Sequence, residues 1–289
     1  MYVIIYNPKS ANGNGKRECE RIIEKTGETL RFVNLFDIED EVAYINALTE
    51  EEIPVIAGGD GTINHFANLP NIDELKRKVL YFPAGSGNDF WNDVKSVSDG
   101  LFIDLNPYIK DLPEAIINGK TYKFLNGVSI GLDGWCCEVA DEIRKSHSSD
   151  EKIDYVKIAV SGLLGKYIPR SGTVTCDGES RKFDKIWICP IMNGRYYGGG
   201  VMAVPDQYRL AAERTISCLV LHGANRLTAM TIVPETYSGR HVKHKKYCYI
   251  VTGHEITVTL DTPCATQVDG ETIYDVTTIT LRKGELPEE

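Results

Sequence analysis

A short glycine-rich stretch carries the clearest chemical pattern in this sequence. Glycines at positions 58, 59 and 61 surround Asp60, and Thr62 follows them. Glycines leave no side chain in the way, so backbone N–H groups at the start of a helix can approach a phosphate there. A carboxylate such as Asp60 would repel a bare phosphate but suits one that arrives with Mg²⁺. The residue types therefore favour nucleoside triphosphate chemistry, although a glycine turn without a ligand explains them equally well.

The elements around this stretch would place it at the end of a strand. Residues 53–57 are mostly apolar, as in a buried parallel strand, and the glycines then break the run. Thr62 can cap the helix that follows, in which Ile63, Phe66 and Ala67 have helical spacing. The glycines are therefore expected in a tight turn between a strand and a helix.

Two further loops repeat this arrangement. Residues 7–16 follow a strand-like run at 2–6 and precede a helix-like stretch, while residues 83–89 follow an apolar run at 79–82. The first loop is not a Walker A loop, because Ser10 stands where its first glycine should be. Three repeats of strand, loop and helix predict an α/β domain with a parallel sheet, whose loops gather at the carboxyl ends of the strands.

The pattern of residue types changes after about residue 106. Alternating, β-branched segments dominate there, and one helical stretch, predicted over 135–145 and 153–167, interrupts them. A polar loop is expected between those two helices, over 146–150. A series of strands after an α/β half predicts a separate antiparallel β-sandwich domain.

Composition limits the functions available to the chain. Its 289 residues, 42% of them hydrophobic, suffice for two domains with buried cores. No apolar run reaches the length of a membrane span, and no secretory signal precedes the first strand, so a cytoplasmic protein is expected. Eight scattered cysteines without a C-x-x-C pair argue against a zinc cluster. A net charge of −9 disfavours nucleic-acid binding.

One dense basic run contrasts with this acidic background. It spans residues 240–246 and includes His241 and His244, which we assign to a basic patch because no acidic or thiolate partner stands at metal-ligand spacing. A solvated edge is the commoner explanation for such a run. The functional alternative is attraction to anionic lipid headgroups, at about 1 kcal/mol per basic residue near the charged surface.

Four motifs also resemble those of a known family. Residues 58–64, G-G-D-G-T-I-N, resemble the G-G-D-G-T-x-N signature of the diacylglycerol kinase and sphingosine kinase catalytic superfamily, whose G-G-D-G core NAD kinases and phosphofructokinases share. Residues 83–90, P-A-G-S-G-N-D-F, match the P-x-G-T-x-N-D-F motif of lipid kinases, and residues 267–271, Q-V-D-G-E, match their Q-x-D-G-E signature. Residues 7–13 are similar to the N-P-x-S-G-x-G segment that opens their catalytic domains, with Ala11 in place of a glycine.

The resemblance implies roles for individual residues. As nucleotide contacts it implies Asn7, Ser10, Lys16, Gly58, Gly59, Gly61, Thr62, Ser86 and Asn88. As Mg²⁺ ligands it implies Asp60, Asp89, Asp104 and Glu271. Asp269 is implied as the general base, but sphingosine kinases are thought to use the G-G-D-G aspartate, so Asp60 competes for that role. Because Asp60 and Asp89 would belong to one domain and Asp269 to the other, we expect the site in a cleft between the domains.

The same resemblance implies a fold and an activity. Residues 1–106 and about 275–289 would form the nucleotide-binding α/β domain, with a mainly parallel sheet as in NAD kinase and diacylglycerol kinase, and residues 107–274 an antiparallel β-sandwich domain for the lipid. The implied activity is that of an ATP- and Mg²⁺-dependent lipid kinase that phosphorylates a hydroxyl of diacylglycerol or a related lipid. Such an enzyme would be cytoplasmic and peripheral to the membrane, and edge strands are compatible with a homodimer.

Two alternatives to this activity stay open. An NAD kinase would share the G-G-D-G core, but the motif at 83–90 has the lipid kinase form. The other alternative is a nucleotide-binding regulatory protein without turnover. It is suggested by Ala11 and by residues 210–214, L-A-A-E-R, where many bacterial relatives carry an acidic Asp-Gly pair that helps to hold a structural Mg²⁺.

Overall fold

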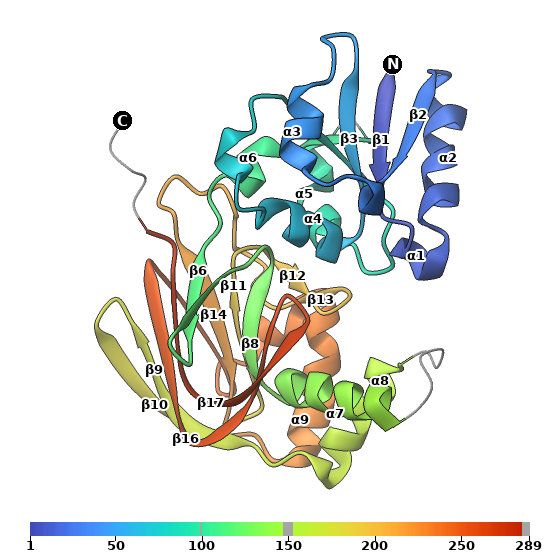
Figure 1. Ribbon diagram of the computed structural model, residues 1–289. Coiled ribbons are helices and arrows are strands. Elements are labelled where there is room, and N and C mark those ends of the chain that lie inside the picture. The colour runs from blue at the N-terminus through green and yellow to red at the C-terminus, as the bar shows by residue number, and fades with distance from the viewer. Residues whose placement is uncertain (99, 147–152, 285–289) are drawn as a thin grey trace. The chain divides into compact units, whose positions relative to one another are not determined.

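The computed structural model describes residues 1–98, 100–146 and 153–284, which form two units (Figure 1). The first unit comprises Met1–Leu112 together with Gly198–Gly200. The second comprises Pro113–Tyr197 and the chain from Val201 onward. Each unit has a sheet and a hydrophobic core of its own.

The first unit is built on a five-stranded sheet with the strand order β2-β1-β3-β4-β5. Its strands are β1 (Tyr2–Tyr6), β2 (Leu30–Asn34), β3 (Ile53–Gly58), β4 (Leu80–Pro83) and β5 (Ile103–Asp104). The first four run parallel, and β5 runs antiparallel to β4. Parallel strands are buried on both faces, which accounts for their apolar runs in the sequence. This confirms the predicted α/β fold with a mainly parallel sheet.

Short helices follow the strands of the first unit. They are α1 (Ser10–Gly13), α2 (Gly15–Thr26), α3 (Glu41–Asn46), α4 (Asp60–Ala67), α5 (Asp89–Val94) and α6 (Asn106–Ile109), with single 3-10 turns at Leu35–Asp37, Ile72–Glu74 and Lys95–Val97. Gly59 takes the N-cap position of α4, so the predicted cap at Thr62 is wrong. The glycines let the chain turn directly from β3 into α4, and Thr62 therefore falls inside the first helical turn.

The second unit contains a ten-stranded antiparallel sheet (Figure 1). Its strands are β6 (Glu114–Ile117), β7 (Lys120–Lys123), β8 (Gly127–Gly131), β9 (Arg170–Cys176), β10 (Glu179–Ile186), β11 (Ile188–Met192), β14 (Ile216–Leu221), β15 (Cys248–Gly253), β16 (Glu255–Val268) and β17 (Glu271–Arg282). A separate two-stranded ladder joins β12 (Tyr196–Tyr197) to β13 (Val201–Met202).

Strand β16 gives this sheet its sandwich form. Its residues 256–260 pair with β9, and its residues 266–268 pair with β8. The sheet thereby folds over a core that includes Val174, Ile191 and Val258. This confirms the predicted antiparallel β-sandwich domain.

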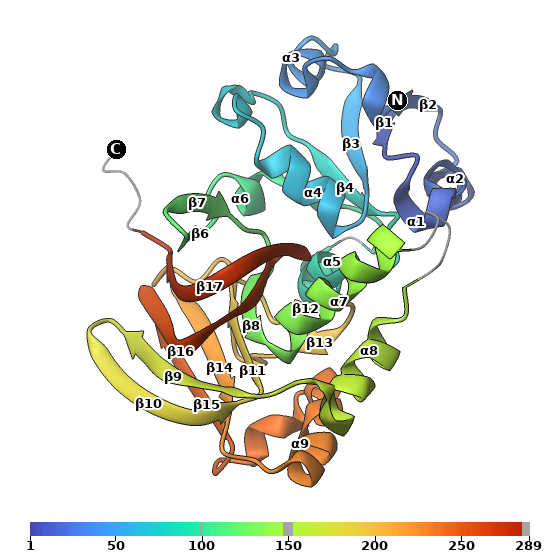
Figure 2. The same ribbon diagram turned by 60° about the horizontal axis from the view of Figure 1, so that its bottom comes forward.

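Helices cover a second core of the same unit (Figures 1 and 2). They are α7 (Leu132–Ser146), α8 (Tyr155–Ser161), a π-helical turn η4 (Gly162–Lys166), α9 (Arg226–Ile232) and the 3-10 segments η5 (Val233–Ser238) and η6 (Arg240–Lys243). The predicted helices correspond to α7 and to α8 with η4, while residues 147–150 of the predicted loop lie outside the described residues. None of the described helices has the length and apolar content that a membrane span needs.

The C-terminal strand differs from the prediction. β17 pairs antiparallel with β16 and β6, so residues 275–282 belong to the second sheet and do not return to the first domain. Residues 285–289 lie outside the described residues. A two-residue turn joins β16 to β17, and such a hairpin keeps both strands in one sheet. The first unit also continues past residue 106 to Leu112, because α6 packs Tyr108 against Phe90 with ring centroids 5.1 Å apart.

Candidate functional site

Three loops of the first unit meet at the carboxyl ends of β1, β3 and β4. The first loop is joined to α4 through Asn7, whose Nδ2 donates to the Thr62 hydroxyl at 3.0 Å. The Asn7 backbone N–H donates to the Ala57 carbonyl at 3.1 Å, at the end of β3. Thr62 is buried, so this contact is part of the packing between the two loops. The structure therefore brings Asn7 and Thr62 together, and it bonds them to each other.

The second and third loops touch through their glycines. A Cβ atom placed on Gly85 would lie 2.3 Å from the Gly59 Cα atom, a separation that no side chain can adopt. A Cβ atom on Gly58 would meet the Thr62 hydroxyl at 2.3 Å. The Gly58 carbonyl accepts a hydrogen bond from the buried Tyr81 hydroxyl at 3.0 Å, a support that the sequence did not indicate. Glycine is thus required here for the close packing of two turns.

Gly61 and Ser86 are the predicted nucleotide contacts with open space around them. Both are exposed, and nothing lies within 4 Å of a Cβ atom placed on Gly61. Asn88 instead closes its own loop, because its side chain accepts from the Gly85 N–H at 3.1 Å and donates to the Gly85 carbonyl at 2.8 Å. A nucleotide could therefore approach Gly61 and Ser86 without displacing a side chain.

Ser10 and Lys16 lie in the first loop and at the start of α2. Ser10 begins α1 and donates its backbone N–H to the Asn7 carbonyl at 3.1 Å. The Lys16 ammonium lies over the Phe32 ring, 5.5 Å from its centroid, in a cation–π contact with β2. The structure therefore keeps Ser10 beside Asn7 but gives Lys16 a partner on the neighbouring strand.

Asp60 joins the second loop to the helix that follows the third. Its two carboxylate oxygens accept from the backbone N–H groups of Asp89 and Phe90, at 2.9 Å and 2.7 Å. These are the first residues of α5, whose N-cap residue Asn88 provides no side-chain cap of its own. Asp60 thus caps α5 from a distant part of the sequence, where the positive end of the helix dipole favours a carboxylate.

Asp89 extends the same chain of contacts to a third glycine-rich segment. Its buried carboxylate accepts from the backbone N–H groups of Gly199 and Gly200, at 2.8 Å and 2.7 Å. Gly198, Gly199 and Gly200 have φ values of 61°, 83° and 111°, a region that favours glycine. This contact places Gly198–Gly200 in the first unit. In the sequence, these glycines and residues 203–206 resemble the G-G-x-x-x-x-P-x-A stretch of lipid kinases, but this resemblance did not suggest a place in the site.

Asp60 and Asp89 are the carboxylates that fit a Mg²⁺–nucleotide complex. Within the described residues, no three His, Cys, Asp or Glu side chains are grouped closely enough to hold a metal by themselves. Mg²⁺ does not need such a cage, because it keeps several waters and is usually bound through one or two carboxylates and the substrate phosphates. A Cβ atom placed on Gly87 would lie 3.7 Å from the Asp60 Oδ2, so a glycine loop borders this carboxylate. The residues therefore fit a metal that arrives with the nucleotide.

Asp104 does not lie with these residues. It is paired with Leu80, at the amino end of β4, because β5 runs antiparallel to β4. The glycine loops follow the carboxyl end of β4 at Pro83, about 10 Å further along the strand at the usual rise per residue. Asp104 instead forms an ion pair with Lys78 at 3.4 Å. The predicted role of Asp104 as a Mg²⁺ ligand thus has no support in its position.

In the second unit, Asp269 occupies the turn between β16 and β17. Asp269 and Gly270 have φ values of 46° and 93°, as in a two-residue hairpin turn with both residues at positive φ. The Asp269 carboxylate accepts from three consecutive backbone N–H groups, those of residues 125, 126 and 127, at 2.5, 2.9 and 3.0 Å. The Gly270 N–H donates to the Gln267 side chain at 2.7 Å. Glu271 begins β17 and is exposed.

Buried cations hold the segment that binds Asp269. The Arg209 guanidinium donates to the Leu125 carbonyl at 2.6 Å and to the Asn126 side-chain oxygen at 2.7 Å. The Lys283 ammonium donates to the Asn193 side-chain oxygen at 3.0 Å, and Asn193 donates to the same Leu125 carbonyl at 3.0 Å. Both cations are buried. No motif in the sequence marked either residue, and the network fixes the backbone on which Asp269 depends.

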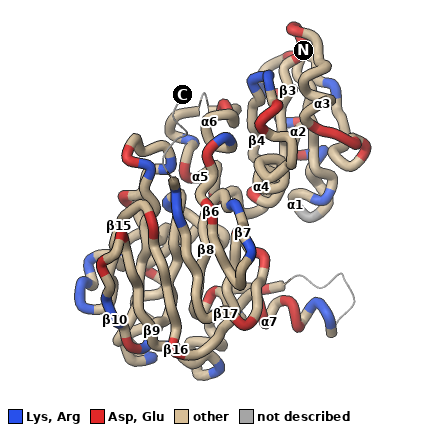
Figure 3. The backbone as a smooth tube through the Cα atoms, turned by 60° about the vertical axis from the view of Figure 1, so that its left-hand side comes forward, with Lys and Arg blue, Asp and Glu red and all other residues tan. Residues whose placement is uncertain are grey.

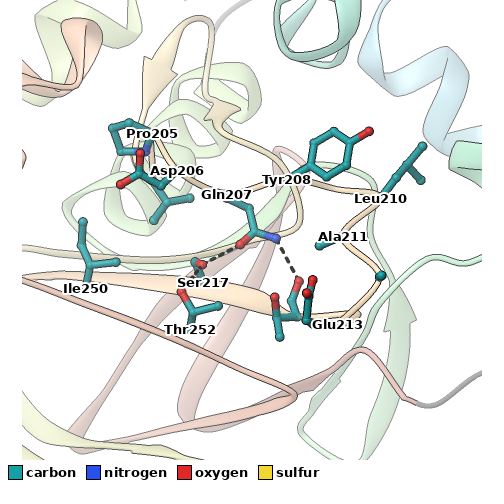
Figure 4. Close-up of a pocket in the computed structure, with 13 residues that line it drawn as sticks. Pro205, Asp206, Gln207, Tyr208, Leu210, Ala211, Glu213, Ser217, Ile250 and Thr252 are labelled. Atoms are coloured by element: carbon teal, nitrogen blue, oxygen red, sulfur yellow. Dashed lines mark hydrogen bonds between the residues drawn. The ribbon is translucent and has the colours of Figure 1, made fainter. Parts of the chain in front are cut away.

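A cavity of about 520 Å³ lies in the region where the sequence lacks the expected acidic pair. Its polar lining includes Asp206, Gln207, Glu213 and Ser217 (Figure 4). The Gln207 side chain accepts from the Ser217 hydroxyl at 2.5 Å and donates to the Thr215 carbonyl at 2.9 Å. The two carboxylates that line the cavity, those of Asp206 and Glu213, do not form part of a metal-binding group among the described residues.

The predicted basic patch at residues 240–246 is exposed only in part. His241 is fully buried, and its Nε2 donates to the Ala203 carbonyl at 2.9 Å, so its assignment to an exposed patch is wrong. Burial also lowers the pKa of His241, since it disfavours the charged imidazole. Glu235 binds His244 at 2.8 Å and Lys243 at 3.4 Å. His241 of η6 is buried and binds a backbone carbonyl, which a charge count could not show.

Comparison with known proteins places this geometry in a family. Residues 1–123 match the model of the diacylglycerol kinase catalytic domain, and residues 126–283 match that of the YegS C-terminal NAD kinase beta sandwich-like domain. An α/β unit with glycine-rich loops and an antiparallel β-sandwich unit are the architecture that the two models define together. The chain belongs to the diacylglycerol kinase-like lipid kinase superfamily.

Individual relatives agree with this assignment. The chain is 23% identical over 264 residues to the Bacillus subtilis (strain 168) protein named Putative lipid kinase YtlR, with 84% of each chain covered. It is 24% identical over 273 residues to the Klebsiella pneumoniae (strain 342) protein named Probable lipid kinase YegS-like, with 90% of this chain and 88% of that one covered. A crystal structure of a putative diacylglycerol kinase from Bacillus anthracis strain Sterne has a TM-score of 0.60 at 18% identity, over 97% of this chain and 93% of that chain. The structural likeness shows a shared fold.

Proposed function

We propose that this protein is an ATP- and Mg²⁺-dependent lipid kinase that phosphorylates a hydroxyl of diacylglycerol or a related lipid. One observation carries the proposal: the glycine loops that follow β1, β3 and β4 are in contact, and Asp60 and Asp89 tie two of them to Gly198–Gly200. The membership of this chain in the diacylglycerol kinase-like lipid kinase superfamily also supports the proposal.

The phosphates would be bound where the loops leave open space. Gly61 and the first turn of α4 offer backbone N–H groups without an obstructing side chain, and Ser86 is exposed in the neighbouring loop. Asp60 and Asp89 would hold Mg²⁺ directly or through water. When bound, the metal neutralises charge that develops on the transferred phosphoryl group.

The acceptor hydroxyl needs a carboxylate that positions it and takes its proton. Asp60 and Asp269 are the two candidates for this base, in different units. Each accepts hydrogen bonds from backbone N–H groups that fix its orientation. A fixed carboxylate suits a general base, because proton transfer requires hydrogen-bond reach to the hydroxyl. Glu271 follows Asp269 after one residue and would support the metal from the second unit.

Transfer of labelled γ-phosphate from Mg-ATP tests this function. The acceptors would be diacylglycerol, sphingosine, phosphatidylglycerol and NAD, with the products separated between organic and aqueous phases. We expect label in the organic phase and a loss of kcat/KM of about 100-fold or more in Asp60→Asn and Asp269→Asn, the range that acid–base catalysis contributes. Asp261→Asn is the matched control, because Asp261 is an exposed aspartate of β16.

Three results would contradict the proposal. Label on NAD alone would favour an NAD kinase. No label on any acceptor, combined with a rise in melting temperature on addition of Mg-ATP, would favour a regulatory nucleotide-binding protein. Equal losses in Asp261→Asn and in the two site variants would show that the effect is not specific to the site.

A further inference from the structure

The segment Gly198–Gly200 is the turn of a short β-hairpin. Strands β12 and β13 flank it, with Tyr196 opposite Met202 and Tyr197 opposite Val201 (Figures 1 and 2). Each strand is only two residues long, and a two-stranded ladder is marginally stable at best by itself. The geometry of the turn must therefore depend on the groups that hold the two ends of the hairpin.

The tip of the hairpin binds a carboxylate with neutral donors. The N–H groups of Gly199 and Gly200 bind the two oxygens of the Asp89 side chain, at 2.8 Å and 2.7 Å. Successive backbone N–H groups of this kind form concavities that bind anions. Residues 196–203 contain no Lys, Arg, Asp or Glu, although charged residues are found along both units of this acidic chain (Figure 3). The tip therefore orients the carboxylate and adds no positive charge that would compete with a metal ion.

Tyr197 holds the first strand of the hairpin. Its side chain is buried, and its hydroxyl donates to the Asp133 Oδ2 at 2.8 Å. The Ser129 hydroxyl donates to the same oxygen. Asp133 lies in the first turn of α7, which packs closely on β16, since a Cβ atom placed on Gly134 would lie 2.3 Å from the Ala265 carbonyl oxygen. The residue directly before the glycine tip is thus bonded to a carboxylate on a well-packed helix.

His241 holds the second strand. Ala203 follows β13 directly, and its N–H closes the ladder by donating to the Arg195 carbonyl at 3.0 Å. The Ala203 carbonyl accepts from Nε2 of the fully buried His241 at 2.9 Å. A Cβ atom placed on Gly239 would lie 2.9 Å from the Met202 Sδ, so the junction of η5 and η6 also packs closely against β13. A buried side chain therefore fixes each strand of the hairpin.

We propose that Tyr197 and His241 are positioning residues, which hold the β12–β13 hairpin so that its glycine tip orients the Asp89 carboxylate toward the Mg²⁺ of a bound nucleotide. Groups behind a metal-binding carboxylate fix its orientation and thereby tune its affinity for the metal. Tyr197 and His241 need not touch the nucleotide, because each acts through the backbone that it holds. The inference rests on the proposed function, in which Asp89 binds the metal directly or through water.

Calorimetric titration with Mg-ATP, without a lipid acceptor, tests this role apart from turnover. Tyr197→Phe keeps the ring and removes the hydroxyl, and it should bind Mg-ATP about tenfold more weakly, as is typical when a group behind a metal ligand is lost. Binding of ATP in EDTA should be unchanged, because the carboxylate acts through the metal. Tyr196→Phe makes the same change on the same strand, and Tyr167→Phe makes it at another buried position of the second unit. Both controls should bind Mg-ATP like the native chain.

Two variants of His241 separate its hydrogen bond from its packing. In His241→Gln the amide nitrogen can still donate to the Ala203 carbonyl, whereas His241→Met fills a similar volume without a donor. We expect His241→Gln to bind Mg-ATP like the native chain and His241→Met to bind it about tenfold more weakly. Equal weakening in the two variants would show that His241 contributes packing alone and would overturn its assignment as a positioning residue.

Amide hydrogen exchange follows the tip directly and needs neither metal nor substrate. In the peptide that contains Gly199 and Gly200, exchange should be about fivefold faster in Tyr197→Phe and in His241→Met than in the native chain, the factor expected for the loss of one typical hydrogen bond. Tyr196→Phe should exchange like the native chain.

The outcomes of these experiments separate the two proposals. Unchanged exchange and unchanged Mg-ATP binding in Tyr197→Phe and His241→Met would overturn the positioning role. Equal weakening of Mg-ATP and of ATP in EDTA would also overturn it, since the effect would then not pass through the Asp89 carboxylate and its metal. A native chain that binds no Mg-ATP would contradict the proposed function, while the exchange rates would still decide whether Tyr197 and His241 hold the tip.

Discussion

The aspartates selected for chemistry also hold the backbone together. Asp60, Asp89 and Asp269 each accept hydrogen bonds from N–H groups of a segment far away in the sequence. Hydrogen bonds to a charged group are stronger than those between neutral groups. A substitution at one of these positions therefore changes the local fold as well as the reactive group, and activity alone cannot separate the two effects.

Asp269→Asn should destabilise the second unit by about 1–3 kcal/mol, the penalty of leaving a backbone donor without an acceptor. The asparagine NH₂ group cannot accept from the N–H groups that the second carboxylate oxygen binds. Urea unfolding of the native chain, of this variant and of the control Asp261→Asn measures the effect. An Asp269→Asn protein with native stability and no activity would show that the carboxylate acts in the reaction alone.

At the scale of elements, the packing of two glycine turns sets the geometry of the first unit. A Cβ atom on Gly85 would lie 2.3 Å from the Gly59 Cα atom, and one on Gly59 would lie 3.1 Å from the Gly85 Cα atom, whereas Gly61 faces open space only two residues from Gly59. The same motif thus contains a glycine needed for folding and a glycine whose surroundings leave room for a ligand. The two requirements can be separated by mutation.

Gly61→Ala should preserve or raise stability but weaken nucleotide binding. Alanine is favoured over glycine inside a helix by about 1 kcal/mol, and its methyl group meets no atom of the protein. The added methyl would stand where a phosphate approaches, so we expect KM for ATP to rise about tenfold or more. Gly85→Ala, in contrast, should lower stability by about 1–3 kcal/mol through overpacking. Thermal unfolding and steady-state kinetics distinguish them, and an unchanged KM in Gly61→Ala would argue against a phosphate at this turn.

The sequence predicted these elements well where the information is local. The apolar run of β3 and the glycines after it specify a strand-to-helix turn, and the Asp-Gly pair at 269 specifies a hairpin turn. The position of Asp104 could not be predicted in this way, because it depends on β5 running antiparallel to β4. The place of β17 in the second sheet depends likewise on pairing between strands, which a one-dimensional pattern does not contain.

The candidate site shows the same division. The motifs identified Asp60, Asp89 and Gly61, but the bonds from Gly199 and Gly200 to Asp89 join residues more than a hundred positions apart. The buried Arg209 was also missed, because a single arginine carries no spacing signal and its role appears only through the carbonyl that it binds. The residue types of the motifs indicated the chemistry to expect. Which of these residues lie close together depends on long-range contacts, which the motifs do not contain.

At the scale of the whole molecule, each unit contains thiols that can report on its opening. Cys19 is the only cysteine of the first unit, is fully buried, and has its pKa raised to about 12 by burial, with further contributions from Glu18 and Glu20. Cys248 of the second unit is also buried, and burial raises its pKa to about 12. Both thiols should react with an alkylating reagent only when their unit opens.

Mg-ATP should therefore slow alkylation of Cys19. At about 100 times its Kd, a ligand that binds only the folded first unit should reduce the rate about 100-fold, because it lowers the population of the opened unit. Peptide mass spectrometry at neutral pH would follow Cys19 and Cys248 in the same sample. A Cys19 rate that does not respond to Mg-ATP would contradict nucleotide binding by the first unit, while equal slowing of Cys248 would show that the two units open together.

The Gly198–Gly200 segment has a consequence for how such proteins can be recombined. It lies within the part of the chain that matches the second domain model, yet it belongs to the first unit and supplies the N–H groups that Asp89 binds. A chimera joined between residues 123 and 126 would combine one parent's Asp89 with the other parent's glycine turn. The structural unit is therefore discontinuous: the N-terminal part of the chain and these three glycines form one unit, although they match different domain models.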